Sequence, residues 1–198
     1  PFQPDMGWEQ GDTLATTMFN IYVDAVLQEV WEHPGVPVPC GDATQPLAKL
    51  VALMYADDMC GLAASPESLQ QLINATRAAL KKWRLKASVR PTDGSKTAVM
   101  VVRGGSKAAR LRAATSGPAQ CGEWHWGDTT IPQVRVYRYL GAWVSDAGVW
   151  DEHMACRMHK ADAAVRANNS VLKNNRLPWH VRKLTLVAAV QPVLTYAC

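Results

Sequence analysis

Residues 50–64 read LVALMYADDMCGLAA, two short apolar runs on either side of a pair of aspartates. Short apolar runs are typical of strands, and Asp is a common turn residue, so this stretch predicts a hairpin of two buried strands. The turn would hold Asp57 and Asp58. Adjacent carboxylates repel each other, and a bound cation relieves the repulsion when they are partly desolvated. Because both groups are hard oxygen donors, Mg²⁺ or Mn²⁺ is the expected metal.

A solvated turn that only ends two strands is the alternative interpretation, since Asp is an ordinary turn residue. The apolar flanks, together with Tyr55 two positions before the first aspartate, favour a functional site. A zinc site built on His153, Cys156 and His159 is disfavoured. A spacing of three residues drifts around a helix, and zinc would need a further ligand.

On both sides of the hairpin, the spacing of apolar residues and the turn-forming residues predict the remaining elements. The expected elements are helices over 12–31, over 65–86, from 151 and from 178, strands over 96–102 and 134–144, and a second hairpin over 123–131. The second helix starts with a capping Ser65, Pro66 at the first helical position and Glu67 in the first turn. This order predicts an α+β fold whose antiparallel sheet carries helices on one face.

Charge is unevenly divided along the chain, although the net charge is only +4. Residues 1–76 contain ten acidic residues and one basic residue, whereas residues 77–198 contain twenty basic and seven acidic residues. The steepest part, Arg77–Arg112, has eleven bases and one acid. A basic surface beside an acidic one suggests a polyanion partner on one side and cations on the other. A solvated basic helix face is the simpler alternative.

Composition excludes several classes of protein. Hydrophobic residues make up 48% of the chain and charged residues 19%, which is typical of a globular protein and not of a disordered one. Because no stretch of about 18 uncharged apolar residues occurs, no membrane partner is expected. The five cysteines are widely spaced and odd in number, which argues against a disulfide framework and indicates a reducing, intracellular compartment.

Tyr55-Ala56-Asp57-Asp58 resembles the catalytic hairpin of reverse transcriptases, and further motifs follow in that family's order. Gln10-Gly11 and the helix after it resemble the loop and helix that precede the hairpin. Ser95–Met100 resembles the Lys-Thr strand that follows it. Tyr139-Leu140-Gly141 resembles a segment of LINE-type, non-LTR elements, and residues 177–197 resemble the first thumb helices of those proteins. Together these motifs cover nearly the whole chain.

The resemblance implies a right-hand polymerase palm, an antiparallel sheet with helices on one face, followed by the start of a helical thumb. Residues 1–145 would be part of the palm and residues 146–198 the beginning of the thumb, with the fingers absent. The activity would be RNA-directed DNA polymerisation, a two-metal nucleotidyl transfer to a primer 3′ hydroxyl. The partners would be an RNA template, a DNA primer and deoxynucleoside triphosphates. The family's work at chromosomal DNA makes a nucleus the expected location.

The resemblance also assigns roles to individual residues. It implies catalysis and metal binding for Asp57 and Asp58, proximity to the primer end for Tyr55, template and nucleotide contacts for Gln10 and Gly11, a triphosphate contact for Lys96, and a primer grip for Tyr139, Leu140 and Gly141. Two of these roles have a physical basis. A glycine permits close approach of the backbone, and a lysine offsets charge that develops on phosphates.

One ligand of the family's metal site has no counterpart in these residues. Reverse transcriptases take a further aspartate from a strand before the Gln-Gly loop, and Asp5 lies too close to Gln10 to be that residue. We therefore expect a fragment that does not polymerise alone. The fingers and the missing part of the palm would lie upstream in the same parent protein.

Three alternatives stay open. A non-catalytic retroelement relic that binds RNA or protein predicts binding without primer extension. An RNA-dependent RNA polymerase shares the aspartate hairpin, although the Tyr-Leu-Gly segment and the thumb-like tail disfavour it. A structural α+β domain without an active site leaves the order of the motifs unexplained.

Overall fold

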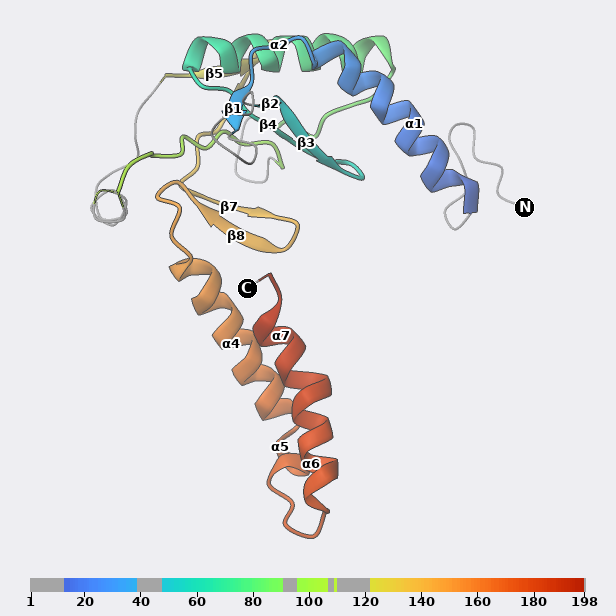
Figure 1. Ribbon diagram of the computed structural model, residues 1–198, viewed down its shortest axis with the longest axis vertical. Coiled ribbons are helices and arrows are strands. Elements are labelled where there is room, and N and C mark those ends of the chain that lie inside the picture. Colours follow the sequence, from blue (N-terminus) through green and yellow to red (C-terminus); the bar gives the residue numbers. More distant parts are fainter. Residues whose placement is uncertain (1–12, 39–47, 91–95, 107–108, 110–121, 198) are drawn as a thin grey trace. The chain divides into compact units, whose positions relative to one another are not determined.

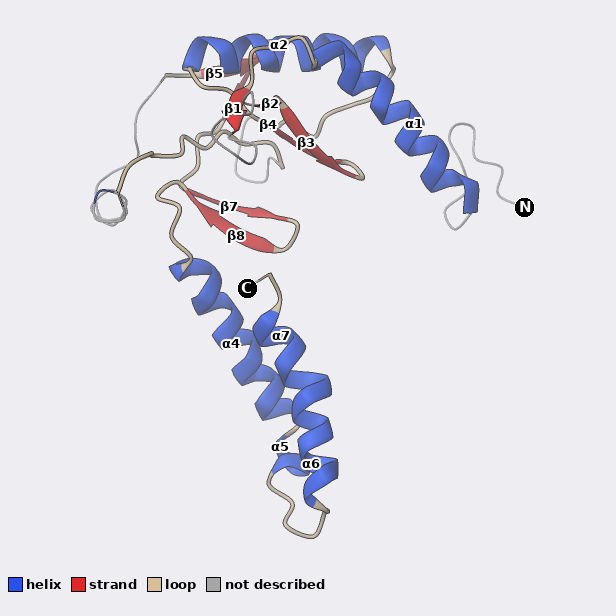
Figure 2. Cartoon of the chain, in the orientation of Figure 1, coloured by secondary structure: helices blue, strands red, loops and turns tan. Residues whose placement is uncertain are grey.

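The computed structural model describes residues 13–38, 48–90, 96–106, 109 and 122–197 (Figure 1). These residues form helices and short antiparallel strands, which Figure 2 distinguishes by colour, in agreement with the predicted α+β class. The chain divides into two compact units, one made of Pro1–Val99 and Gln120–Gln133, the other of Met100–Ala119 and Val134–Cys198. Within the described ranges, no helix combines the length and the apolar character needed to cross a membrane.

In the first unit, the described residues form two long helices and three strand pairs. Its elements are α1 (Thr13–Val30), β1 (Val36–Val38), β2 (Ala48–Leu50), β3 (Ala52–Tyr55), β4 (Asp58–Gly61), α2 (Pro66–Lys82), β5 (Trp124–Trp126) and β6 (Thr129–Ile131). In the second unit, the described residues form one strand pair followed by helices. Its elements are β7 (Val136–Tyr139), β8 (Ala142–Ser145), α4 (Asp151–Ala167), α5 (Asn169–Leu172), α6 (Trp179–Thr185), the π-helical η1 (Leu186–Val190) and α7 (Gln191–Thr195).

Every strand of the described chain pairs with its neighbour in sequence, in the ladders β1–β2, β3–β4, β5–β6 and β7–β8. All four ladders are antiparallel, as expected. They are separate two-stranded ladders in the described residues, whereas the sequence predicted one continuous sheet. Beyond these ladders, the described residues contain one isolated parallel bridge, between Val99 and Gln133.

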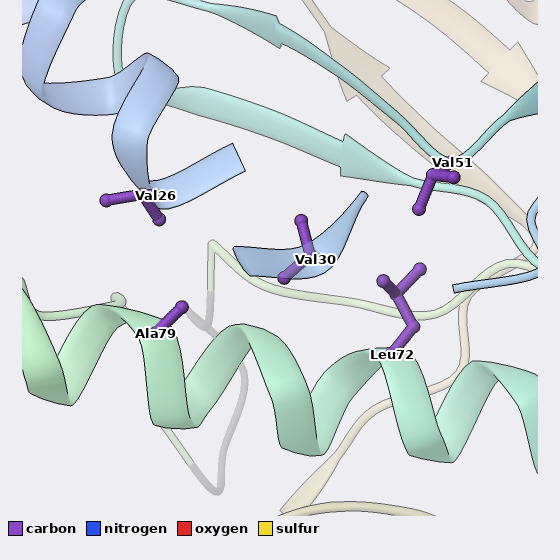
Figure 3. Close-up of a cluster of buried hydrophobic side chains, with 5 residues drawn as sticks. All are labelled: Val26, Val30, Val51, Leu72 and Ala79. Carbon is purple, nitrogen blue, oxygen red and sulfur yellow. The ribbon is translucent and has the colours of Figure 1, made fainter. Parts of the chain in front are cut away.

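The core of the first unit lies where α1 and α2 meet the strands (Figure 3). Val26 and Val30 come from α1, Leu72 and Ala79 from α2, and Val51 precedes β3. Spacings of four and seven residues place each helical pair on one face of its helix. The helix predicted over 12–31 is therefore confirmed as α1, but only the C-terminal part of its apolar stripe is buried. The earlier members of the stripe, Leu14, Met18, Ile21 and Tyr22, are exposed.

Helix α2 begins where the sequence predicted. Ser65 is its N-cap: its Oγ accepts a hydrogen bond from the Ser68 backbone N–H at 3.2 Å. In return, the Ser68 Oγ accepts one from the Ser65 N–H at 3.1 Å, which completes a capping box.

A backbone hydrogen bond and one from Ser65 lower the pKa of the exposed Glu67 carboxyl. This stabilisation is present above the ordinary pKa and is lost as the pH falls through the lowered pKa.

The Ser65→Ala variant is expected to lower the free energy of unfolding by about 1 kcal/mol, because the N–H of Ser68 loses its acceptor. Urea denaturation followed by circular dichroism measures the change. Ser170→Ala is the matched control, since Ser170 is exposed in α5 and its hydroxyl has no partner among the described residues. Equal losses in the two variants would contradict the assignment of the cap.

Three sequence predictions need correction. The helix predicted to reach residue 86 ends at Lys82, because Arg84 adopts a left-handed backbone with φ +56°. Residues 96–102 do not form a strand: the Val99 N–H donates to the Pro132 carbonyl at 2.9 Å, and this lone bridge does not extend into a ladder. Residues 134–144 form the hairpin β7–β8 instead of one strand, because Leu140 and Gly141 turn the chain back.

The hairpin and the later helices agree better with the sequence. β5 and β6 pair around Gly127, whose φ of +62° suits a two-residue turn. Asn168 ends α4, as expected of a helix break, and Pro178 stands at the start of α6. The π-helical η1 was not predicted. It lies just before Pro192, whose missing N–H cannot continue the regular hydrogen-bond pattern of the helix.

Candidate active site

The β3–β4 hairpin carries the aspartate pair. Its register places Tyr55 opposite Asp58 and Met54 opposite Met59. Alternate residues of a strand point to opposite faces, so Met54 and Met59 share one face and Tyr55 and Asp58 share the other. Met59 packs against the core of α1 and α2, while Tyr55 is 67% exposed. Burial of the methionine face therefore directs Tyr55 and Asp58 to solvent.

The turn of this hairpin consists of Ala56 and Asp57, and Asp58 is already the first residue of β4. Ala56 has a φ of +52°. A residue with a Cβ in this left-handed region lowers the stability of the fold by about 1 kcal/mol, and the strand pairing on either side must offset that loss. The strained alanine places Asp57 at the tip of the hairpin.

The strands of the hairpin are less buried than predicted. Leu53 is 47% exposed, and Val51, just before β3, is the fully buried residue of this stretch. In the described structure the ladder has two strands, and Met59 is the residue of β4 that packs against the core of α1 and α2. Toward the base of the hairpin, Cys60 is partly buried, and this burial raises the pKa of its thiol.

Both carboxylates of the pair are exposed, and neither has a hydrogen-bond or ion-pair partner among the described residues. Water therefore weakens the repulsion between Asp57 and Asp58, and the case for a cation rests on the chemistry of two adjacent oxygen donors. The described residues hold no group of three or more His, Cys, Asp or Glu side chains arranged to bind a metal. The pair fits Mg²⁺ as part of a ligand set.

The structure brings Tyr55, Asp57 and Asp58 together at one end of one hairpin. Lys96 is exposed and belongs to the same unit, in a segment without regular secondary structure. Gln10 and Gly11 lie outside the described residues. The Tyr139–Gly141 segment forms the β7–β8 turn of the second unit.

Two residues that contact the β7–β8 turn were not identified from the sequence. The Arg157 Nη2 donates to the Gly141 carbonyl at 2.8 Å, and the Tyr196 hydroxyl donates to the Leu140 carbonyl at 2.6 Å. In the structure Arg157 lies on one face of α4 with His153 and Ala161, and all three are buried, but the sequence alone does not mark an arginine as buried. Tyr196 had no local signal either.

The basic region Arg77–Arg112 contains bases that support the fold and bases that face solvent. The Arg77 guanidinium lies against Gly127, Lys82 pairs with Glu29 at 2.6 Å, and Arg103 lies 4.0 Å from the Asp146 carboxylate. Among the bases of this region that the structure describes, those that are exposed are Arg77, Lys81, Lys82, Arg84, Lys86, Arg90 and Lys96. They leave positive charge at the surface, as the charge pattern suggested.

Comparison with known proteins identifies the family. Residues 3–144 match the family described as reverse transcriptase (RNA-dependent DNA polymerase). Over 139 residues the chain is 29% identical to the retrovirus-related Pol polyprotein from type-1 retrotransposable element R2 of Nasonia vitripennis, a match that covers 70% of this chain and 12% of that protein. No solved structure matches the chain. The chain belongs to the reverse transcriptase family.

Proposed function

We propose that residues 1–145 form part of the palm, and residues 146–198 the beginning of the thumb, of an RNA-directed DNA polymerase. The observation that carries the proposal is the exposed aspartate pair at the end of the β3–β4 hairpin, inside the region that matches the family. A hairpin held by Met59 on one face and open on the other can present carboxylates to a large ligand such as a primer–template duplex.

The proposed reaction is attack of the primer 3′ hydroxyl on the α-phosphate of a deoxynucleoside triphosphate, with diphosphate as the leaving group. Asp57 and Asp58 would hold Mg²⁺, which activates the hydroxyl and neutralises charge on the phosphates. Tyr55 shares the exposed face of Asp58, where it would lie beside the primer end.

The remaining site residues have supporting roles in the proposal. Lys96 would offset charge on the triphosphate, and Gln10 with Gly11 would contact the template and the pairing nucleotide. The Tyr139–Gly141 turn would contact the primer backbone as its grip. The exposed bases of Arg77–Arg112 and of the C-terminal helices would follow the phosphates of the duplex.

The proposal includes a third carboxylate from outside these residues. Two carboxylates alone leave a two-metal site short of ligands, and the described residues add no third one to the pair. In the family the missing aspartate lies on a strand before the Gln-Gly loop. These residues by themselves are therefore expected to extend no primer, whereas a longer protein that adds that strand should do so.

Primer extension tests the proposal in such a longer protein. A DNA primer on an RNA template should be extended with deoxynucleotides and Mg²⁺, and a chelator should stop the reaction. Extension with ribonucleotides alone would instead indicate an RNA polymerase. Absence of extension with either nucleotide, in a protein that carries all three aspartates, would contradict the proposal.

A non-catalytic RNA-binding protein is the second candidate, favoured by the exposed bases after residue 80. In either case we expect the chain to bind single-stranded RNA with an affinity that falls about tenfold between about 50 and 200 mM salt, the loss that two or three phosphate contacts produce. Fluorescence anisotropy with a labelled RNA measures the dependence. An affinity independent of salt would contradict phosphate binding by this surface.

A further inference from the structure

The β7–β8 turn of the second unit is held by its backbone carbonyls. Leu140 and Gly141 have φ values of +47° and +83°, the pattern of a type I′ turn. Both carbonyl oxygens accept hydrogen bonds from residues far along the chain. Tyr196 donates its hydroxyl to the Leu140 oxygen at 2.6 Å, and Arg157 donates Nη2 to the Gly141 oxygen at 2.8 Å.

These two donors also contact each other. The Arg157 guanidinium carbon lies 4.4 Å from the centre of the Tyr196 ring, a cation–π contact. Arg157 is only 7% exposed, whereas Tyr196 is 47% exposed, so the arginine is the member of the pair that is removed from water. Because charge-assisted hydrogen bonds strengthen when desolvated, the bond from Arg157 to the Gly141 carbonyl is the stronger contact. We call Arg157 and Tyr196, with their bonds to the turn, the clamp.

His153 joins the clamp to β8 and to the end of the chain. The Trp143 N–H donates to His153 Nδ1 at 3.2 Å, so Nε2 carries the proton and donates to the Tyr196 carbonyl at 3.1 Å. His153 is 1% exposed, a satisfied core histidine. The contacts therefore connect the turn, α4 and the segment after α7.

Gly141 is matched to this clamp. A Cβ at that position would lie 3.0 Å from the Tyr196 hydroxyl oxygen and 3.2 Å from its Cε1. The left-handed φ and the close ring both require glycine. The conformation of the turn therefore depends both on its own backbone and on the side chains of Arg157 and Tyr196, which lie sixteen or more residues further along the chain.

We infer that Arg157 and Tyr196 are positioning residues that hold the Tyr139–Gly141 turn in the one conformation that binds the primer strand. The inference rests on the proposed role of that turn as a primer grip. Arg157 is buried and acts through the turn. With both carbonyl oxygens engaged by donors, the turn does not present them to the primer phosphates, which they would repel. Loss of either hydrogen-bond donor lowers the fraction of chains with this turn conformation. The apparent affinity for the primer strand then falls in the same proportion.

The Tyr196→Phe variant tests the inference, because it removes one hydroxyl and keeps the ring over Arg157. Thr195→Val is the matched control: it removes the neighbouring hydroxyl, which bonds only the Gln191 carbonyl in the described structure. Each chain is titrated with a DNA primer annealed to RNA and, separately, with the single-stranded RNA. We expect Tyr196→Phe to weaken duplex binding roughly three- to tenfold, with RNA binding unchanged and the circular dichroism spectrum of the folded chain retained. Thr195→Val should change none of these.

Arg157→Lys is the second variant, which keeps the charge but loses the planar fork, and it should weaken duplex binding in the same way. Unchanged duplex affinity in both variants, with tight wild-type binding, would overturn the inference and leave the proposed function standing. Equal losses for the duplex and for RNA would show a general structural role and would also overturn it. A wild-type chain that does not bind the duplex would contradict the proposed function itself.

Discussion

The Asp57→Asn variant is expected to reduce RNA-templated primer extension by about a thousandfold or more in a polymerase that contains these residues. Asparagine keeps the size of the side chain but removes the negative charge, and a neutral amide is a poor ligand for Mg²⁺. Asp57 stands at the tip of the β3–β4 turn, where no other described carboxylate apart from Asp58 adjoins it. Gel-resolved extension products, measured over time, give the rate.

The chain offers a matched control for this substitution. Asp128 is also an exposed aspartate in the two-residue turn of a hairpin, β5–β6, within the same unit. Asp128→Asn removes the same charge from an equivalent local structure and should leave extension unchanged. If both variants extend primers like the parent, the catalytic assignment of Asp57 is wrong. If neither the parent nor the variants extend but all bind RNA alike, the non-catalytic alternative gains support.

The Leu72→Ala variant is expected to lower the free energy of unfolding by about 3 kcal/mol, the largest loss expected within the cluster of Val26, Val30, Val51, Leu72 and Ala79. Leu72 is 3% exposed and packs with Val30 and Val51. Its side chain also lies against Gly61 at the end of β4, where an added Cβ would be 3.1 Å from Leu72 Cδ2. Truncation leaves a cavity between α2 and the hairpin that carries the aspartates. Urea denaturation measures the loss.

Leu53→Ala is the control for stability, because Leu53 belongs to the hairpin but is 47% exposed. Truncation of Leu53 should lower the free energy of unfolding by less than about 1 kcal/mol, as surface substitutions usually do. Similar losses in the two variants would show that the core is not where the described packing places it.

Features set by neighbouring residues could be predicted from the sequence. The hairpin around Asp57, the start of α2 at Ser65 and the turn at Gly127 each depend on a few adjacent side chains and on backbone preferences. The family motifs were equally readable, since the resemblance to reverse transcriptases rests on short segments in a fixed order. The match over residues 3–144 confirms that identification.

Features set by distant partners could not be predicted in this way. Residues 96–102 have the composition of a strand but pair only at Val99, since a ladder needs a partner that local sequence does not specify. The exposure of Leu53 depends on which face of the hairpin meets the helices. Apolar content alone predicted burial on both faces.

The residue types of the candidate site could be read from the sequence alone: the aspartate pair, the tyrosine beside it and the Tyr139-Leu140-Gly141 motif. That residues 139–141 form a turn, and which groups hold that turn and the aspartate hairpin in place, became visible only in the folded chain. Met59 directs the hairpin outward by packing on the core, and Arg157 with Tyr196 holds the turn by bonding its carbonyls. Local patterns specify turns and helix ends because their energies come from adjacent residues. Support from residues far along the chain arises only when folding brings them together.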